Sequence, residues 1–209
     1  LGDVYKRQVT DWEKCINSFR VEFDCDIYIT GSNAKLLSGE LATNLGGRYV
    51  EFTIYPFSFS EFTELYKGIF PSAQPQECFQ KYLLFGGMPY LANLRYAEEP
   101  CRQYLTDVFN SVQLKDIVKR NKIRDVDLLE RILSYIIANV GTTFSATSIS
   151  KFFKSEKRNV APETILNYIR HCTDAYLFYP VKRQDLQGKQ ILASSEKYYI
   201  ADHGVREAV

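Results

Sequence analysis

The sequence predicts a fold of the α/β plus α class. Part of a parallel-sheet core comes first, a helical region follows, and a winged helix comes last. Three observations predict this order: strand and helix signals alternate between residues 10 and 55, strand signals are rare from 57 to 142, and two helices precede a β-hairpin signal in the last part. We therefore expect boundaries at residues 9–66, 67–142 and 143–209.

The first part shows helix, strand, helix and strand in turn. Residues 10–20 predict a helix because apolar side chains recur at helical spacing, and residues 27–30 predict a short strand of β-branched and aromatic residues. Residues 34–45 predict an amphipathic helix that stops at Gly46-Gly47, and residues 49–55 alternate as a second strand before Pro56. This succession is typical of the latter half of a three-layer α/β unit.

The middle part predicts three helices. Residues 76–85 form the first, closed by Gly86-Gly87, and residues 100–119 form the second. The third covers residues 126–140 and has the strongest apolar periodicity.

The last part predicts a short helix through Ile149 and Phe153, then a basic loop at 154–158. Pro162 suits the first position of a further helix, and residues 176–183 and 191–201 predict two strands. Helix, helix and hairpin is the order of a winged helix.

Composition excludes several classes of protein. The chain has 209 residues, of which 45% are apolar and 14% aromatic, which indicates a globular protein. Its formal net charge of +1 excludes a uniformly basic nucleic-acid-binding surface. Five scattered cysteines without a CxxC pair predict reduced thiols and no metal site. No apolar run approaches the ~18 residues of a membrane span, so we expect a cytoplasmic protein without a membrane partner.

Both ends of the chain depart from the pattern. Residues 1–8 do not continue into the first predicted helix and resemble a translated sequencing adapter, so we expect them to be an artefact outside the fold. Residues 202–209 follow a strand signal and stop abruptly. We expect an interior fragment of a longer protein.

Ser32, Asn33 and Arg48 are the candidate site residues of the first part. Ser32 and Asn33 follow an apolar strand, where a polar side chain can orient water at a γ-phosphate or sense that phosphate. Both residues are also preferred helix caps, and the two interpretations are compatible. Arg48 suits the neutralisation of transition-state charge, whereas the alternative is a surface arginine after a Gly-Gly turn.

The sequence lacks the elements that hold a nucleotide. It contains no GxxxxGK[ST] loop, and no apolar strand ends in the acidic pair that would hold magnesium. We therefore expect that this chain alone holds neither ATP nor Mg²⁺ and does not hydrolyse ATP.

Several motifs resemble those of a family of prokaryotic predicted ATPases of the AAA+ superfamily, which carry a C-terminal domain of unknown function. The motifs are residues 11–13, 26–34, 47–49, 55–62, 82–89 and 197–204, in the family's order. The resemblance implies that Ser32 and Asn33 are sensor residues and that Arg48 is a trans-acting arginine finger. It also implies that ATP and magnesium bind the intact parent, and that a P-loop segment and a nuclease-like domain lie outside this chain.

The winged helix leads to a second hypothesis, a DNA-binding protein without catalysis. Arg170 on its second helix and Lys182 and Arg183 beside the wing would contact DNA, although acids are interspersed on that helix. The basic stretch 115–124 is interpreted as a solvated helix end, and His171 and His203 have no ligand spacing. The third hypothesis is a structural module, with a homo-oligomer or another protein as its partner.

Overall fold

The computed structural model describes residues 12–32, 49–182 and 196–209. The chain divides into two compact units, residues 1–53 and 54–209. The smaller unit contains α2 (Trp12–Glu22), which agrees with the helix predicted over residues 10–20. The helix predicted over 34–45 and the adapter-like residues 1–8 lie outside the described residues.

The two strands predicted in the first part are not strands in this structure. Residues 27–30 and 49–55 join no ladder among the described residues. A strand needs a neighbouring strand to satisfy its backbone groups, and the described part of the chain offers none to either segment. Several of their apolar side chains are exposed instead: Tyr28 is 85% exposed and Phe52 77%.

The larger unit is mostly helical and has one hydrophobic core. In chain order its elements are α4 (Phe59–Ile69), α5 (Pro75–Phe85), η2 (Pro89–Ala92), α6 (Glu98–Ser111), η3 (Val112–Lys119), α7 (Val126–Ala138), α8 (Ala146–Ser155), α9 (Pro162–Asp174), β1 (Phe178–Val181), β2 (Lys197–Ile200) and α10 (His203–Ala208). The helices predicted over 76–85 and 126–140, and the helix predicted to begin at Pro162, are therefore confirmed, with small shifts at the ends of the first two.

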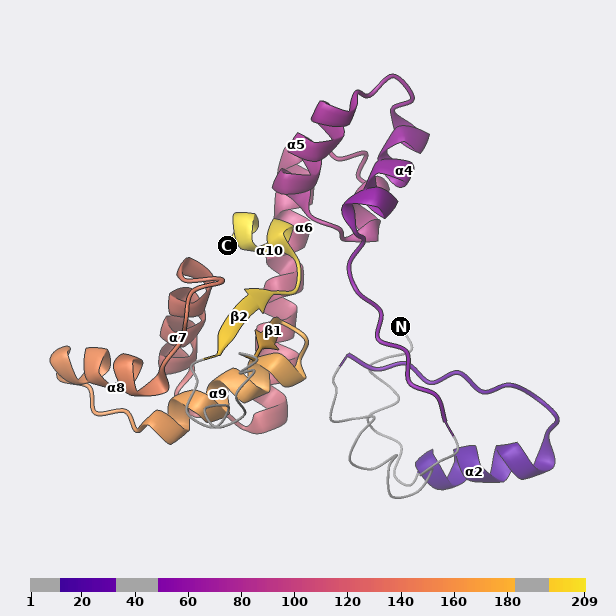
Figure 1. Ribbon diagram of the computed structural model, residues 1–209. Helices are drawn as coiled ribbons and strands as arrows, with labels where there is room; N and C mark the ends of the chain where they lie inside the picture. Colours follow the sequence, from indigo (N-terminus) through magenta and orange to yellow (C-terminus); the bar gives the residue numbers. More distant parts are fainter. Residues whose placement is uncertain (1–11, 33–48, 183–195) are drawn as a thin grey trace, which may run out of the picture. The chain divides into compact units, whose positions relative to one another are not determined.

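The predicted helix 100–119 has two parts. Residues 98–111 are α-helical, and η3 continues them as a π-helix. Such a segment is rare, because its wider turn packs the backbone less well than an α-helix. Ile117 on η3 is fully buried and Gln113 is nearly so, hence this wider turn belongs to the core. Together α6 and η3 run as one long rod through the unit (Figure 1).

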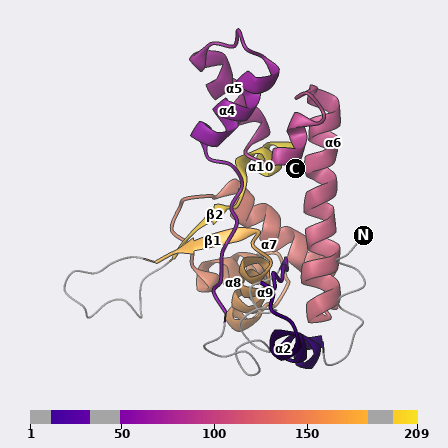
Figure 2. The same ribbon diagram turned by 90° about the vertical axis from the view of Figure 1, so that its right-hand side faces the viewer.

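Helices gather at both ends of this rod. At one end α4 packs on α5, and α10 packs on both α5 and α6. At the other end α9 packs on η3, α7 and α8. Two views at right angles show the same grouping (Figures 1 and 2).

The hairpin predicted for the last part is present but shorter than expected. β1 and β2 pair antiparallel with Phe178 opposite Ile200. Thr143 adds an isolated bridge to Lys197, and the Gly141 N–H donates to the Tyr198 carbonyl. Residues 183–195, between the two strands, lie outside the described residues. The helix, helix and hairpin order is thus observed, whereas the winged-helix assignment stays a prediction.

Candidate functional site

A buried carboxylate joins segments that are far apart in the sequence. Asp202 is 4% exposed, and its Oδ2 accepts a hydrogen bond from the Gly87 N–H at 2.7 Å. Its Oδ1 accepts from the Val205 N–H at 3.2 Å and so caps the start of α10. Hydrogen bonds of this kind are stronger than neutral ones because the acceptor is ionised, and the two donors offset the cost of removing the carboxylate from water.

Close backbone approach explains the glycines that follow α5. Gly86 has a φ of +73°, and a Cβ placed on it would lie 2.1 Å from Asp202 Oδ1. A Cβ on Gly87 would lie 2.1 Å from the Phe57 carbonyl oxygen. Both distances are far shorter than any real Cβ contact, so these positions accept no side chain. The Gly-Gly pair therefore does more than end the helix.

Phe57 is the third member of this contact. Its N–H donates to the Gly87 carbonyl at 2.8 Å, and its carbonyl accepts from the Tyr82 hydroxyl at 3.1 Å. Both backbone polar groups of Phe57 are thus held by residues 82–87. We call Phe57, Tyr82, Gly86, Gly87 and Asp202 the Asp202 junction.

The ring of Tyr82 lies inside the junction. It meets the ring of His203 edge-on at 4.5 Å, and His203 Nε2 is hydrogen-bonded to the Tyr82 carbonyl. Burial raises the pKa of the Tyr82 hydroxyl, and the negative charges of Asp202 and Glu61 raise it further. Tyr82 therefore stays a neutral hydroxyl that donates to Phe57.

A capping box fixes the start of the helix that follows Phe57. Ser58 is the N-cap of α4, and its side chain accepts from the Glu61 N–H while Glu61 accepts from the Ser58 N–H at 2.8 Å. This capping box stabilises the first turn of α4 immediately after the junction. On the other side of Phe57, the ring of Tyr55 contacts the ring of Tyr179 on β1 at 5.5 Å.

The polar groups of the Asp202 junction connect chain segments to one another. Its one carboxylate is already used by two backbone amides, and the described residues contain no group of three His, Cys, Asp or Glu side chains that could hold a metal ion. This arrangement holds three segments in register.

The predicted site residues lie away from this junction or outside the described residues. Ser32 is partly exposed at a bend of the smaller unit, and Asn33 and Arg48 lie outside the described residues. Arg170 is exposed on α9, and Lys182 is exposed directly after β1. Arg183 also lies outside the described residues. Their roles remain predictions.

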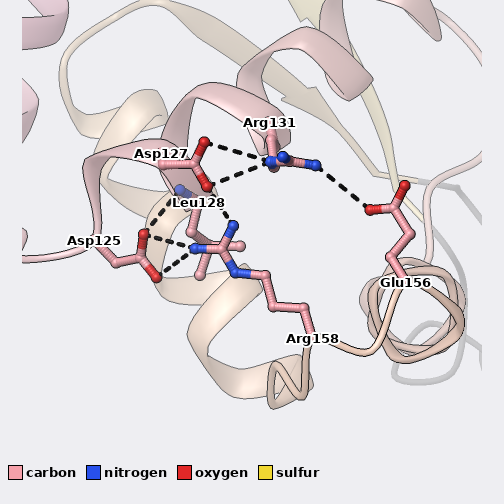
Figure 3. Close-up of polar contacts among 6 residues, drawn as sticks. All are labelled: Asp125, Asp127, Leu128, Arg131, Glu156 and Arg158. Carbon is pink, nitrogen blue, oxygen red and sulfur yellow. Dashed lines mark hydrogen bonds and ion pairs between the residues drawn. The ribbon is translucent and has the colours of Figure 1, made fainter.

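A second polar cluster joins α7 to the turn between α8 and α9. Arg158 donates to both carboxylate oxygens of Asp125, at 2.7 and 2.8 Å, and also to Asp127 (Figure 3). Arg131 pairs with Asp127 at 3.3 Å and with Glu156 at 3.5 Å. The bonds from Arg158 lower the pKa of Asp125 and of Asp127 below the usual range.

This cluster changes the interpretation of the basic loop 154–158. Asp125 also caps α7 by accepting from the Leu128 N–H at 3.0 Å. Arg158 is therefore a clamp on the start of α7, and its charge is already matched. These side chains are partly exposed, so the ion pairs contribute modestly to stability.

The junction was not among the residues predicted to carry function. The sequence predicted that Gly86 and Gly87 end a helix, and it placed them and Asp202 within two of the family-like motifs. A local signal did exist, because a Gly-Gly pair directly after a helix and an Asp directly before one both indicate special backbone positions. Their contact could not be inferred, since it spans 115 positions.

Comparisons with known proteins divide the chain in two. Residues 7–63 match the model of an AAA domain, and residues 76–209 match the model described as "Domain of unknown function (DUF8612)". No solved structure was found to match. Among the described residues, no helix is both long and apolar enough to cross a membrane.

Two curated relatives cover nearly the whole chain. An uncharacterized protein of Haemophilus influenzae is 39% identical over 199 residues, which is 95% of this chain and 49% of that protein. An uncharacterized protein of Methanocaldococcus jannaschii is 28% identical over 207 residues, 94% of this chain and 45% of that protein. The chain spans about half the length of the curated relatives that it matches.

Proposed function

This chain belongs to the family of the domain of unknown function DUF8612, and we propose that it is the nucleotide-sensing and coupling part of an AAA-type ATPase. In this proposal Ser32 and Asn33 sense the nucleotide, and Arg48 acts as an arginine finger toward a neighbouring subunit. The segment matched by the AAA model carries all three residues.

The Asp202 junction is the observation that carries the coupling. Phe57 lies within the AAA match, whereas Gly87 and Asp202 lie within the second match. The backbone of Phe57 is bonded to Gly87 and Tyr82, and Asp202 holds Gly87 in turn. The chain runs from Arg48 directly into the segment that ends at Phe57. A shift of that segment would therefore reach α5 and α10 through these hydrogen bonds, of which the one between Gly87 and Asp202 is buried.

The exposed apolar side chains of the smaller unit support the proposal that its sheet is completed by other strands. Val21, Tyr28, Val50 and Phe52 are each 77% exposed or more. Burial of such side chains contributes about 25 cal/mol per Å² of apolar surface, so their exposure favours a partner. We propose that residues 27–30 and 49–53 pair with further strands of the parent protein's AAA domain.

ATP and magnesium belong to that parent protein in this proposal. The sequence contains no phosphate-binding loop, and the described residues provide no acidic cluster for a metal ion. In this proposal the parent protein holds both ligands, and no chemical step is assigned to this chain alone.

Reconstitution tests the proposal. The purified chain is expected to release no phosphate from ATP, and adding the segment that precedes residue 9 in the parent protein is expected to restore turnover. Asn33→Ala and Arg48→Ala should each lower the restored rate, whereas Arg20→Ala serves as an exposed control in the same unit. A preceding segment without a glycine-rich loop ending in Lys-Ser or Lys-Thr would contradict the proposal.

A second candidate function is DNA binding by a winged helix. The order α7, α8, α9, β1 and β2 favours it, together with the bridge between Thr143 and Lys197. In that fold α9 would face the DNA, with Arg170, Lys182 and Arg183 as contacts. The exposed face of α9 also carries Glu163 and the apolar Leu166, which weakens its attraction to phosphate.

A further inference from the structure

The end of η3 concentrates positive charge. Residues 115–124 contain five cations and one acid, in a chain whose net charge is only +1. Lys115, Lys119, Lys122 and Arg124 are all exposed. We call these four residues the basic end of η3.

The acids nearest in the sequence are already paired with other cations. Asp116 pairs with Arg120 at 3.3 Å, and both of these side chains are mostly buried. Asp125 and Asp127 are held by Arg158, and Asp127 also by Arg131 (Figure 3). Within the described part of the chain, no ion pair joins the four exposed cations to a carboxylate. Their charge therefore faces solvent without local compensation.

The backbone under these cations is well held. Ile117 is fully buried, and the Asn121 side chain donates to the Ile117 carbonyl at 2.9 Å. The Ile123 N–H donates to the Val118 carbonyl at 3.0 Å and closes the helix end. Lys115 and Lys119 are four positions apart on η3, so they share one face. A partner would meet charges whose backbone is already ordered, which lowers the entropy cost of binding.

The helix end alone does not explain this pattern. Cations in the last turn of a helix are stabilised by its dipole, which accounts for Lys119. Lys122 and Arg124 lie beyond that turn, and Lys115 lies a turn before it. The run 115–124 contains no aromatic residue on which a base could stack. Separate positive charges without such a platform suit the evenly charged backbone of a duplex.

We propose that the basic end of η3 binds the phosphate backbone of duplex nucleic acid without sequence preference. The α9 helix packs on η3, so the predicted recognition helix belongs to the same assembly of helices (Figure 1). The main electrostatic contact nevertheless comes from η3 and not from α9. This inference does not depend on ATP, so it stands or falls separately from the ATPase proposal.

Fluorescence anisotropy with a labelled random DNA duplex tests it on the whole chain without nucleotide. The double variant Lys119→Ala/Lys122→Ala is expected to bind about tenfold more weakly, and the slope of its salt dependence should fall by about 0.9 for each phosphate that is no longer neutralised. The matched control Lys151→Ala/Lys154→Ala removes the same charge from the exposed face of α8 and should bind like the unmodified chain. Circular dichroism checks that each variant is folded.

Four outcomes would overturn the inference. The first is unchanged binding by the η3 variant, and the second is equally weakened binding by the α8 control, which would indicate a mere net-charge effect. The third is loss of binding in Arg170→Ala/Lys182→Ala alone, which would place the contact on α9. The same titration with a duplex RNA shows whether the phosphate backbone that binds is that of DNA or of RNA. Tighter, Lys119-dependent binding to anionic phosphatidylserine vesicles than to either duplex would also contradict it.

Discussion

Gly87 donates its backbone N–H to Oδ2 of the buried Asp202 at 2.7 Å, across 115 positions of the sequence. The same glycine accepts from the N–H of Phe57 at 2.8 Å. One residue thus connects the segment matched by the AAA model to the last helix of the chain. Two backbone hydrogen bonds of Gly87 thus join residues that lie in the two matched segments.

Asp202→Ala is expected to destabilise the larger unit by about 3 kcal/mol, because it leaves the buried Gly87 and Val205 amides without an acceptor. Urea denaturation followed by circular dichroism measures the change in the free energy of unfolding. Asp107→Ala, at an exposed position on α6, is the control and should change stability by less than about 0.5 kcal/mol. Equal effects of the two substitutions would show that Asp202 has no special role.

Gly87→Ala is expected to cost about 3 kcal/mol or more, because the new Cβ would overlap the Phe57 carbonyl oxygen. Gly68→Ala provides the matched control. Gly68 lies in α4 with no atom within 4 Å of an added Cβ, so that substitution should stabilise the protein by about 0.5–1 kcal/mol. Thermal denaturation of the two variants should therefore give shifts of opposite sign.

Arg158→Ala is expected to lower stability at neutral pH and to have no such effect in acid. The pKa values of Asp125 and Asp127 are lowered in the folded protein, so their pairing with Arg158 stabilises it above the unfolded carboxyl pKa. That stabilisation is lost as the pH falls through the lower, folded values. Urea midpoints for the unmodified chain and the variant should thus converge once the pH lies below those folded pKa values. Arg158→Lys should recover only part of the effect, since an ammonium lacks the bidentate fork.

Alkaline titration should reveal several protected tyrosines, and Tyr66 and Tyr96 are among them. Burial raises the pKa of Tyr66 to about 12, helped by its hydrogen bond to Glu77, and burial raises that of Tyr96 to about 12. Because these folded pKa values lie above the unfolded value near 10, the stability they contribute is present below pH 10 and is lost between about pH 10 and 12. Phenolate absorbance should show Tyr66→Phe and Tyr96→Phe each removing a late-titrating group. Removal of an early-titrating group would contradict this assignment.

Local periodicity was sufficient to predict many of the helices. The helices at 75–85, 126–138 and 162–174 bury one apolar face each, and spacing alone reveals such a face. The π-helical turn of η3 was not predicted, because the same residues fit an α-helix equally well by local pattern. Residues 27–30 and 49–55 have strand composition, yet a strand forms only when another strand pairs with it.

Neighbouring residues were enough to locate these helices, to identify the faces they bury and to show that a phosphate-binding loop is absent, because such properties are local. Which polar groups meet depended on the tertiary fold. The fold brings Asp202 against Gly87, which in turn contacts Phe57, and it pairs Arg158 with Asp125 and Asp127. Within the part of the chain that the structure describes, it thereby left the basic end of η3 without acidic partners. A buried polar group takes whichever partner the fold brings within about 3 Å, and sequence distance has no influence on that choice.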